Sequence, residues 1–220
     1  MDWDERYASA DGYLYGDRPN AFLAAEAHRI APRSRVLAVA DGEGRNGVYL
    51  AEQGALVHSV EGSAVAIEKA KRRAAQCHVT LTFEQADLIQ WNWPVAAYDA
   101  VVAIFVQFVT RDERPSFFRH LREALRPGGV LLIEGYRVEQ LDFGTGGPRD
   151  ASHFYTEAML REAFAGMRIE VLRSYDTVIE EGTAHVGRCH AAARTARSRP
   201  SRHRRHRLPA RGRRRPSPRH

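Results

Sequence analysis

The chain has few cysteines, few lysines and no long apolar run. Its two cysteines, Cys77 and Cys189, are too few for a disulfide framework, which predicts a reducing, cytoplasmic location. No stretch approaches the roughly 18 apolar residues that cross a bilayer, and the first residues do not read as a signal peptide. These absences argue against a membrane-spanning or disulfide-stapled protein. A length of 220 residues then suits one domain with a full core.

Acidic residues are missing from the C-terminal end. Residues 194–220 hold 12 of the 33 Lys and Arg residues and no acid, so residues 1–193 carry 21 basic against 27 acidic side chains. We therefore expect an acidic domain over 1–193, including an N-terminal lid over 1–18, and a disordered basic tail over 194–220. The tail would bind nucleic acid only non-specifically, because it lacks aromatic residues for base stacking.

Strands and helices alternate along the first 165 or so residues. Apolar runs predict strands at 35–40, 56–60, 79–84, 98–105 and 130–134, and helical patterns lie at 20–28, 46–53, 63–76, 112–125 and 156–164. Two further strands, at 168–176 and 184–189, are joined by Glu180-Glu181-Gly182 and read as a hairpin. This order predicts a doubly wound α/β sheet that is mainly parallel and closes with a hairpin.

A glycine turn follows the first strand. Residues 36–47 read Val-Leu-Ala-Val-Ala-Asp-Gly-Glu-Gly-Arg-Asn-Gly, an apolar run that breaks and restarts as a helix. Gly42 and Gly44 let the backbone turn sharply and approach a ligand without a Cβ in the way. The free amide groups at the start of the helix would face that ligand. The pattern therefore predicts a loop that binds a nucleotide-type cofactor.

The glycine pattern alone fits either a nicotinamide dinucleotide or a methyl donor. Glu61, 17 residues after Gly44, could hold ribose hydroxyls in both cases. Three features favour S-adenosyl-L-methionine. Asp87 follows the third strand, and a carboxylate there can accept a hydrogen bond from the adenine amine. In addition, a Pro-Gly-Gly turn enters the fifth strand and a hairpin ends the domain. Neither lysine has a tyrosine four residues before it, so the Tyr-x-x-x-Lys hydride machinery is missing.

Several motifs in order resemble the class I S-adenosylmethionine-dependent methyltransferases. Within them the likeness is greatest to the small bacterial tellurite-resistance and thiopurine-type enzymes. It is carried by Trp3–Tyr7, Tyr15–Leu23, Asp41–Asn46, Gln85–Leu88, Tyr98–Phe108, Leu125–Ile133, Thr145–Pro148 and His185–Arg188. The resemblance implies a Rossmann-like seven-strand sheet of order 3-2-1-4-5-7-6, with strand seven antiparallel. Ligands would bind at the C-terminal edge of that sheet.

The resemblance also implies a set of cofactor-binding residues. They are Gly42 and Gly44 around the methionine moiety, with Asn46 in the same motif; Glu61, Gly62 and Ser63 at the ribose; Asp87 and Leu88 at the adenine; and Ala103, Ile104 and Phe105 under the sulfonium. Many family members have an acid where Ala38 stands and glycine where Ala40 stands. Asp41 could supply the contact to the methionine amino group from its neighbouring position.

For methyl transfer by in-line displacement, the protein mainly has to align the nucleophile, the methyl group and the sulfur and to exclude water. A base is required only if the acceptor arrives protonated. We expect Tyr7 and Tyr15 of the lid, together with Gln107 and Tyr136 after strands four and five, to shape the acceptor pocket. Arg18 or Arg137 would attract an anion. The sequence does not distinguish a thiol, a metalloid oxyanion, an amine or a hydroxyl as the small-molecule acceptor.

Two other functions stay open at the level of sequence. A nucleic-acid methyltransferase could use the basic tail, although Ala103-Ile-Phe-Val replaces the Asn/Asp-Pro-Pro-Tyr pattern of enzymes that methylate base amino groups. A non-catalytic cofactor-binding protein is the other, because Cys-His-Ala-Ala-Ala-Arg after Arg188 replaces the apolar seventh strand of the family. Cys77-His78 and Cys189-His190 have no evident third ligand, so no metal site is predicted.

Overall fold

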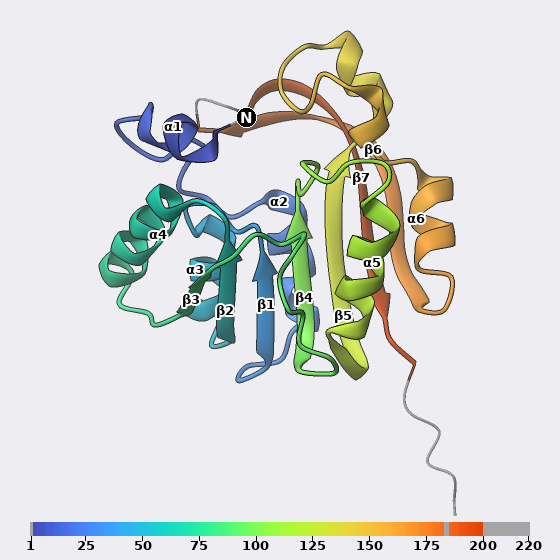
Figure 1. Cartoon of the computed structure of the whole chain (residues 1–220), viewed down its shortest axis with the longest axis horizontal. Coiled ribbons are helices and arrows are strands. Elements are labelled where there is room, and N and C mark those ends of the chain that lie inside the picture. Colours follow the sequence, from blue (N-terminus) through green and yellow to red (C-terminus); the bar gives the residue numbers. More distant parts are fainter. Residues whose placement is uncertain (1, 183–184, 200–220) are drawn as a thin grey trace, which may run out of the picture.

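A single seven-stranded sheet with helices on both faces forms the body of the protein (Figure 1). The structure, a computed structural model, describes residues 2–182 and 185–199. The strand order is β3-β2-β1-β4-β5-β7-β6, and β7 runs antiparallel to both of its neighbours, as predicted. The strands are β1 (Arg35–Val39), β2 (Leu56–Glu61), β3 (Thr82–Gln85), β4 (Tyr98–Ile104), β5 (Leu125–Tyr136), β6 (Arg168–Glu181) and β7 (His185–Arg197).

Local capping residues start several of the helices. Asn20 accepts a hydrogen bond from the amide of Leu23, as expected of a cap, and Ser63 and Thr156 cap their helices in the same way. The helices are α1 (Trp3–Ala8), α2 (Ala21–Glu26), α3 (Arg45–Glu52), α4 (Ala64–Gln76), α5 (Arg114–Glu123) and α6 (Glu157–Ala163), with 3-10 turns η1 (Ala27–Arg29), η2 (Val138–Asp142) and η3 (Ala151–His153). In the described part of the chain, no helix is long and apolar enough to cross a membrane.

The core divides into two layers because the side chains of a strand alternate between faces. In β1, Leu37 and Val39 pack in the layer that contains α5 and α6, whereas Val36 and Ala38 pack in the layer that contains α2, α3 and α4. β5 alternates in the same way. All of its residues from 130 to 136 are buried, so helices can cover both faces of this strand.

The C-terminal ends of β1, β2, β4 and β5 meet at one edge of the sheet. Figure 1 shows α1 beside α4 at this edge, and the segment between β5 and α6 lies at the same edge on the other side. β1 and β4 are adjacent parallel strands, and the chain winds outward in opposite directions from them. In open α/β sheets, ligands bind at this reversal of strand order.

The seventh strand corrects the expected domain boundary. β7 extends to Arg197, four residues beyond the boundary at 193, and its residues from Ala191 to Arg197 pair with β5. The sequence pattern predicts an end of this strand at residue 189, whereas the structure continues it through the alanine-rich segment to Arg197. Ala191, Ala192 and Ala193 are fully buried, and their small side chains fit an interior strand. Of the expected tail, residues 200–220 lie outside the described residues.

Arg194 is buried within β7 although the sequence places it in a basic segment. Its guanidinium donates to the carbonyl oxygens of Leu160 and Phe164, with the second contact at 2.9 Å. Both carbonyls lie at the C-terminal end of α6, where the helix dipole favours a cation, and each also accepts a backbone amide, from Phe164 and Met167 respectively. The next residue, Thr195, points to the opposite face and donates to Glu26 at 3.1 Å.

Removal of these strand residues tests the corrected boundary. A chain shortened after Ala193 loses Arg194 and Thr195 and exposes the edge of β5, so we expect its free energy of unfolding to fall by several kcal/mol. A chain shortened after Arg199 keeps β7 whole and is expected to match the full-length protein within about 0.5 kcal/mol. Urea unfolding followed by circular dichroism measures both. Equal stabilities of the two shortened chains would contradict the assignment of 194–197 to the sheet.

Candidate functional site

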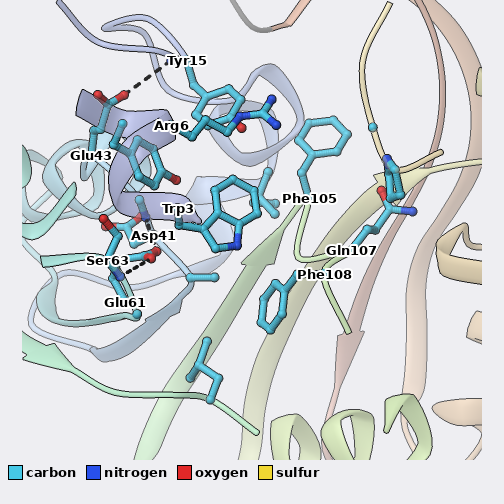
Figure 2. A pocket seen from close by; sticks show the side chains of 18 of the residues that line it. Trp3, Arg6, Tyr15, Asp41, Glu43, Glu61, Ser63, Phe105, Gln107 and Phe108 are labelled. Carbon is cyan, nitrogen blue, oxygen red and sulfur yellow. Dashed lines mark hydrogen bonds between the residues drawn. The ribbon is translucent and has the colours of Figure 1, made fainter. Parts of the chain in front are cut away.

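A cavity of about 1230 Å³ lies at the C-terminal edge of the sheet (Figure 2). Its lining comes from the loops after β1, β2 and β3, the ends of β4 and β5, the N-terminal segment and the loop that leads to η3. Of the residues proposed from sequence, it includes Tyr7, Tyr15, Asp41, Gly42, Asn46, Glu61, Gly62, Ser63, Asp87, Leu88, Ile104, Phe105, Gln107 and Tyr136.

The glycine turn has the backbone that the sequence predicts. Gly42 and Gly44 have φ values of 56° and 78°, in the left-handed region that favours glycine. A Cβ on Gly42 would lie 2.7 Å from the hydroxyl oxygen of Tyr7, so the turn also permits a close approach of the lid. Gly44 is instead the N-cap of α3, and a Cβ there would lie 2.7 Å from that of Ala70. Gly44 therefore serves helix packing and does not line the cavity.

Glu61 joins the loops that follow β1 and β2. One carboxylate oxygen accepts from the amide of Gly42 at 2.9 Å, and the other accepts from the amide of Ser63 at 2.9 Å. The side chain is 6% exposed. Burial raises the pKa of the Glu61 carboxyl, while these amide hydrogen bonds lower it. Each carboxylate oxygen keeps a further lone pair, so the group remains able to accept from a ligand.

Asp41 is the most strongly perturbed acid of the cavity. Its two oxygens accept from the amide of Gly47 at 3.1 Å and from the hydroxyl of Ser59 at 3.2 Å. Burial raises the pKa of Asp41 to about 7, against the effect of these two hydrogen bonds. The negative charge of Glu61 adds to the rise. Asp41 therefore holds the turn in place and lies close to its protonation equilibrium at neutral pH.

Several other proposed cofactor residues are partly or wholly structural. Ala103 is fully buried in the core and does not line the cavity. The side-chain oxygen of Asn46 accepts from the amide of Asn20 at 2.9 Å, which fixes the entry to α2. Asp87 lines the cavity and also caps its own turn, accepting from the amide of Ile89 at 2.9 Å.

The N-terminal segment roofs the cavity from one side. Asp4 accepts from the amide of Val65 at 3.2 Å and from the hydroxyl of Ser63, which ties α1 to the start of α4. The buried ring of Tyr7 lies 5.9 Å from that of Trp3 and 6.1 Å from that of Tyr15. The N-terminal segment is thus packed against the site, and Trp3, Tyr7 and Tyr15 line the cavity. Figure 2 shows Trp3 and Tyr15 in this position.

Lys69 anchors this lid from α4. Its ammonium group donates to the carbonyl oxygens of Tyr7, Ala10 and Gly12 at 2.6, 3.0 and 2.7 Å and to the carboxylate of Glu43 at 3.0 Å. The residue is 8% exposed and Glu43 is 3% exposed. Sequence reasoning missed this pair, because nothing along the chain relates a lysine of α4 to backbone oxygens about 60 positions earlier.

The acceptor end of the cavity differs from the expectation in its charged groups. Arg18 is exposed and away from the cavity, and Arg137 pairs with Glu139 and Asp176, so neither lines it. Arg6 and Arg149 line it instead, together with Trp3, Phe108 and His153, which sequence reasoning also missed. For the residues of α1 a signal was present: Trp3, Arg6 and Tyr7 have the helical spacing that places side chains on one face.

Gln107 and Tyr136 lie at this end, as expected, but their polar groups are mostly engaged with the protein. The amide of Gln107 donates to the carbonyl oxygen of Tyr136 at 2.9 Å and accepts from the backbone amide of Tyr136 at 2.5 Å. The Tyr136 ring is 3% exposed and lies 4.5 Å from the ring of Phe105. Gln107 therefore joins the ends of β4 and β5 and leaves little of its amide for a ligand.

Replacing Lys69 tests whether it anchors the lid. Lys69→Met removes the donor to three backbone oxygens and leaves Glu43 buried without its partner, so we expect a loss of stability of roughly 3 kcal/mol. Amides of residues 3–16 should also exchange faster with solvent, as hydrogen exchange measures. The chain offers a matched control in its other lysine. Lys71→Met removes only an exposed pair with Glu68 and should change stability by less than about 1 kcal/mol. Unchanged exchange in Lys69→Met would contradict the anchor.

The raised pKa of Asp41 predicts a pH dependence of stability. Its value of about 7 lies above the ordinary 3.8, so between these values the folded protein holds a proton that the unfolded chain has lost. The resulting stability is fully present below about pH 4 and is lost as pH rises toward 7. We expect Asp41→Asn to abolish this decline, whose slope is at most about 1.4 kcal/mol per pH unit. Urea unfolding from pH 4 to 8 measures it, with the exposed Asp112→Asn as control. Parallel curves for wild type and Asp41→Asn would refute the prediction.

Comparison with known proteins agrees with this geometry. Residues 36–129 match a family described as a methyltransferase domain. The chain is 30% identical over 128 residues to phosphoethanolamine N-methyltransferase 1 of Zea mays, covering 57% of this chain and 25% of the maize protein. It is 28% identical over 164 residues to glycine/sarcosine N-methyltransferase of Halorhodospira halochloris, covering 70% and 54%. The chain therefore spans about a quarter of one of these relatives and about half of the other.

The fold is also found among solved structures. The crystal structure of TehB from Haemophilus influenzae matches with a TM-score of 0.71 and 18% identity over 90% of this chain and 68% of that one. The family match runs from β1 into the first residues of β5, and the strand order is that of the methyltransferase fold. The chain carries a methyltransferase domain of the class I S-adenosylmethionine-dependent fold.

Proposed function

We propose that the protein transfers a methyl group from S-adenosylmethionine to a small-molecule nucleophile. One observation carries this proposal: a single cavity joins the glycine turn and Glu61 at one end to an aromatic and basic region at the other. Its volume of about 1230 Å³ exceeds the roughly 300–1,000 Å³ typical of a site for one ligand. A cofactor and an acceptor can therefore occupy it together.

The residues present fit the cofactor. The turn at Gly42 offers backbone amides without a Cβ, and the buried carboxylate of Glu61 is already oriented by two amides, with lone pairs left for ribose hydroxyls. The Asp87 carboxylate would accept from the adenine amine, with Leu88 packed against the ring. Asp41 would face the methionine amino group. When bound, S-adenosylmethionine supplies an activated methyl group on a positively charged sulfur.

The contribution of the protein is then to position the acceptor and exclude water. The lid, held by Lys69, covers one side of the cavity, and Phe105 and Tyr136 form an apolar wall at the ends of β4 and β5. Such an enclosure aligns the nucleophile, the methyl carbon and the sulfur, which is the main requirement of an in-line displacement. No described residue has to form a covalent bond in this reaction.

A small acceptor is favoured over a nucleic acid for two reasons. The N-terminal segment covers one side of the cavity and narrows the approach of a polymer. Two relatives matched over 128 and 164 residues are named for small acceptors, phosphoethanolamine and glycine or sarcosine. A third, a 23S rRNA uracil methyltransferase of Halomonas elongata, is 40% identical but matches over only 72 residues. The longer matches therefore support a small acceptor for this chain.

Calorimetric titration tests the cofactor part of the proposal. We expect micromolar binding of S-adenosylmethionine and S-adenosylhomocysteine to the full-length protein. Transfer of a labelled methyl group to a panel of thiols, hydroxyls, amines and chalcogen oxyanions then tests the reaction. A folded protein that binds neither cofactor form would require the proposal to be abandoned.

Glu61→Gln provides the matching variant. The amide that replaces the carboxylate cannot accept from both Gly42 and Ser63, and it loses a charge-assisted bond to ribose worth about 1.5–3 kcal/mol. We therefore expect affinity for S-adenosylhomocysteine to fall about 10- to 100-fold. Glu68→Gln, an exposed substitution on α4, should leave affinity unchanged. Equal affinities of the two variants would argue against ribose binding by Glu61.

A further inference from the structure

His153 has a defined orientation at the acceptor end of the cavity. It ends η3, is half-buried and lines the cavity. Its ring atom Nδ1 lies 3.0 Å from the backbone carbonyl oxygen of Gln107. A carbonyl oxygen can only accept, so Nδ1 carries the hydrogen and Nε2 of the neutral ring carries a lone pair. Nε2 makes no hydrogen bond to the part of the chain that the structure describes.

Hydrogen bonds from side chains also fix the backbone around His153. The side-chain amide of Gln107 donates to the carbonyl oxygen of His153 at 3.1 Å, and Arg114 of α5 donates to the carbonyl oxygen of Ser152. Gln107 is 5% exposed and is itself tied to the end of β5. A histidine whose ring is oriented by one hydrogen bond, with its other nitrogen left to accept, has the arrangement of a general base.

Two carboxylates lie near this imidazole. The pKa of Glu113, before α5, is lowered mainly by hydrogen bonds from Thr110, and that of Asp150 mainly by hydrogen bonds from Ser152. The imidazole of His153 contributes a smaller lowering to both, so both carboxylates lie near it.

The surroundings of His153 also limit the shape of the acceptor. Trp3 and Phe108 lie across the same hollow from Gln107, and Phe105 borders it at the end of β4 (Figure 2). Tyr136 adds a ring 4.5 Å from that of Phe105. Aromatic side chains around a hollow favour planar ring systems, which they contact by stacking or by their edges. A small inorganic oxyanion would leave most of these apolar surfaces uncovered.

We propose that His153 is the general base of the methyl transfer and that the acceptor is an aromatic compound bearing a hydroxyl or a thiol. The inference rests on the proposed function and names the substrate class. The oxygen–hydrogen or sulfur–hydrogen bond of the acceptor breaks, and its proton goes to Nε2 of His153. The freed electron pair forms the bond to the methyl carbon as the carbon–sulfur bond of the donor breaks, leaving a neutral thioether. The imidazolium then returns its proton to solvent.

Pairs of probes that differ in ionisation test the base. Phenol and benzyl mercaptan are protonated at pH 7.5, whereas pentafluorophenol and benzenethiol are ionised and need no base. For His153→Gln we expect kcat to fall about 100-fold or more with the protonated probes and less than about threefold with the ionised ones. The oxygen and sulfur pairs together show which of the two groups is preferred.

His28→Gln is the matched control. His28 makes the same kind of Nδ1 contact to a carbonyl oxygen, that of Ala25 at 2.8 Å, but it is exposed and away from the cavity. We expect this variant to retain wild-type rates with all four probes. The affinity for S-adenosylhomocysteine and the thermal unfolding of both variants establish that the fold and the cofactor site are intact.

Each outcome decides a separate part of the inference. Equal losses with protonated and ionised probes would assign His153 a structural role and overturn it as the base. Methylation of none of the probes by a protein that binds S-adenosylmethionine would overturn the acceptor class, whereas absence of that binding would instead overturn the proposed function. Nitrogen-15 spectra of the histidine rings give a readout independent of activity: a hydrogen on Nε2 of His153, in place of Nδ1, would also overturn the assignment.

Discussion

The buried ammonium of Lys69 is the contact on which the cavity depends. It reaches from α4 to three backbone oxygens of residues 7–12 and to Glu43 of the glycine turn. An ammonium group is costly to bury unless its hydrogens are donated to acceptors. The backbone oxygens of residues 7–12 supply these acceptors, and the lysine in turn holds this segment against α4. The lid carries Trp3, Arg6 and Tyr7 into the cavity lining. Without this anchor, the cavity would lose part of its lining.

The enclosed space divides into two chemically different halves. Around the glycine turn, Asp41 and Glu61 are carboxylates held by backbone amides, and burial raises the pKa of both. Around the ends of β4 and β5 the lining is aromatic and carries Arg149 and His153. Hydrogen-bonded acids suit a ligand with ribose hydroxyls and an amino group, whereas aromatic walls with a histidine suit a protic ring compound. Both halves belong to one cavity, so two ligands bound in them would lie next to each other.

Local signals in the sequence predicted much of the fold. The cap at Asn20, the positive φ of Gly42 and the delivery of Glu61 to the edge of the sheet each depend on a few neighbouring residues. Strand alternation and helical spacing act at the same short range. Because parallel strands bring their ends together, these local predictions place the glycine turn, Glu61 and Asp87 at one edge of the sheet, where all three border the cavity.

The residues that sequence reasoning misplaced are positioned by contacts with residues far away in the chain. Arg194 looked like part of a basic tail because its neighbours are arginine-rich. It is a core residue because β7 pairs with β5 and places its guanidinium at the two carbonyls that end α6. Arg137 was expected to attract an anion, but pairing with Glu139 and Asp176 takes it away from the cavity.

The sequence by itself determined the order of the elements, the glycine turn and the acids at the strand ends, because each follows from residues close together in the chain. The tertiary structure alone decided which groups line the cavity around the ends of β4 and β5. His153 meets the carbonyl of Gln107 across 46 positions, and Lys69 meets that of Tyr7 across 62. Contacts of this span arise only when packing has brought the segments together, since no local pattern records which polar groups will then face one another.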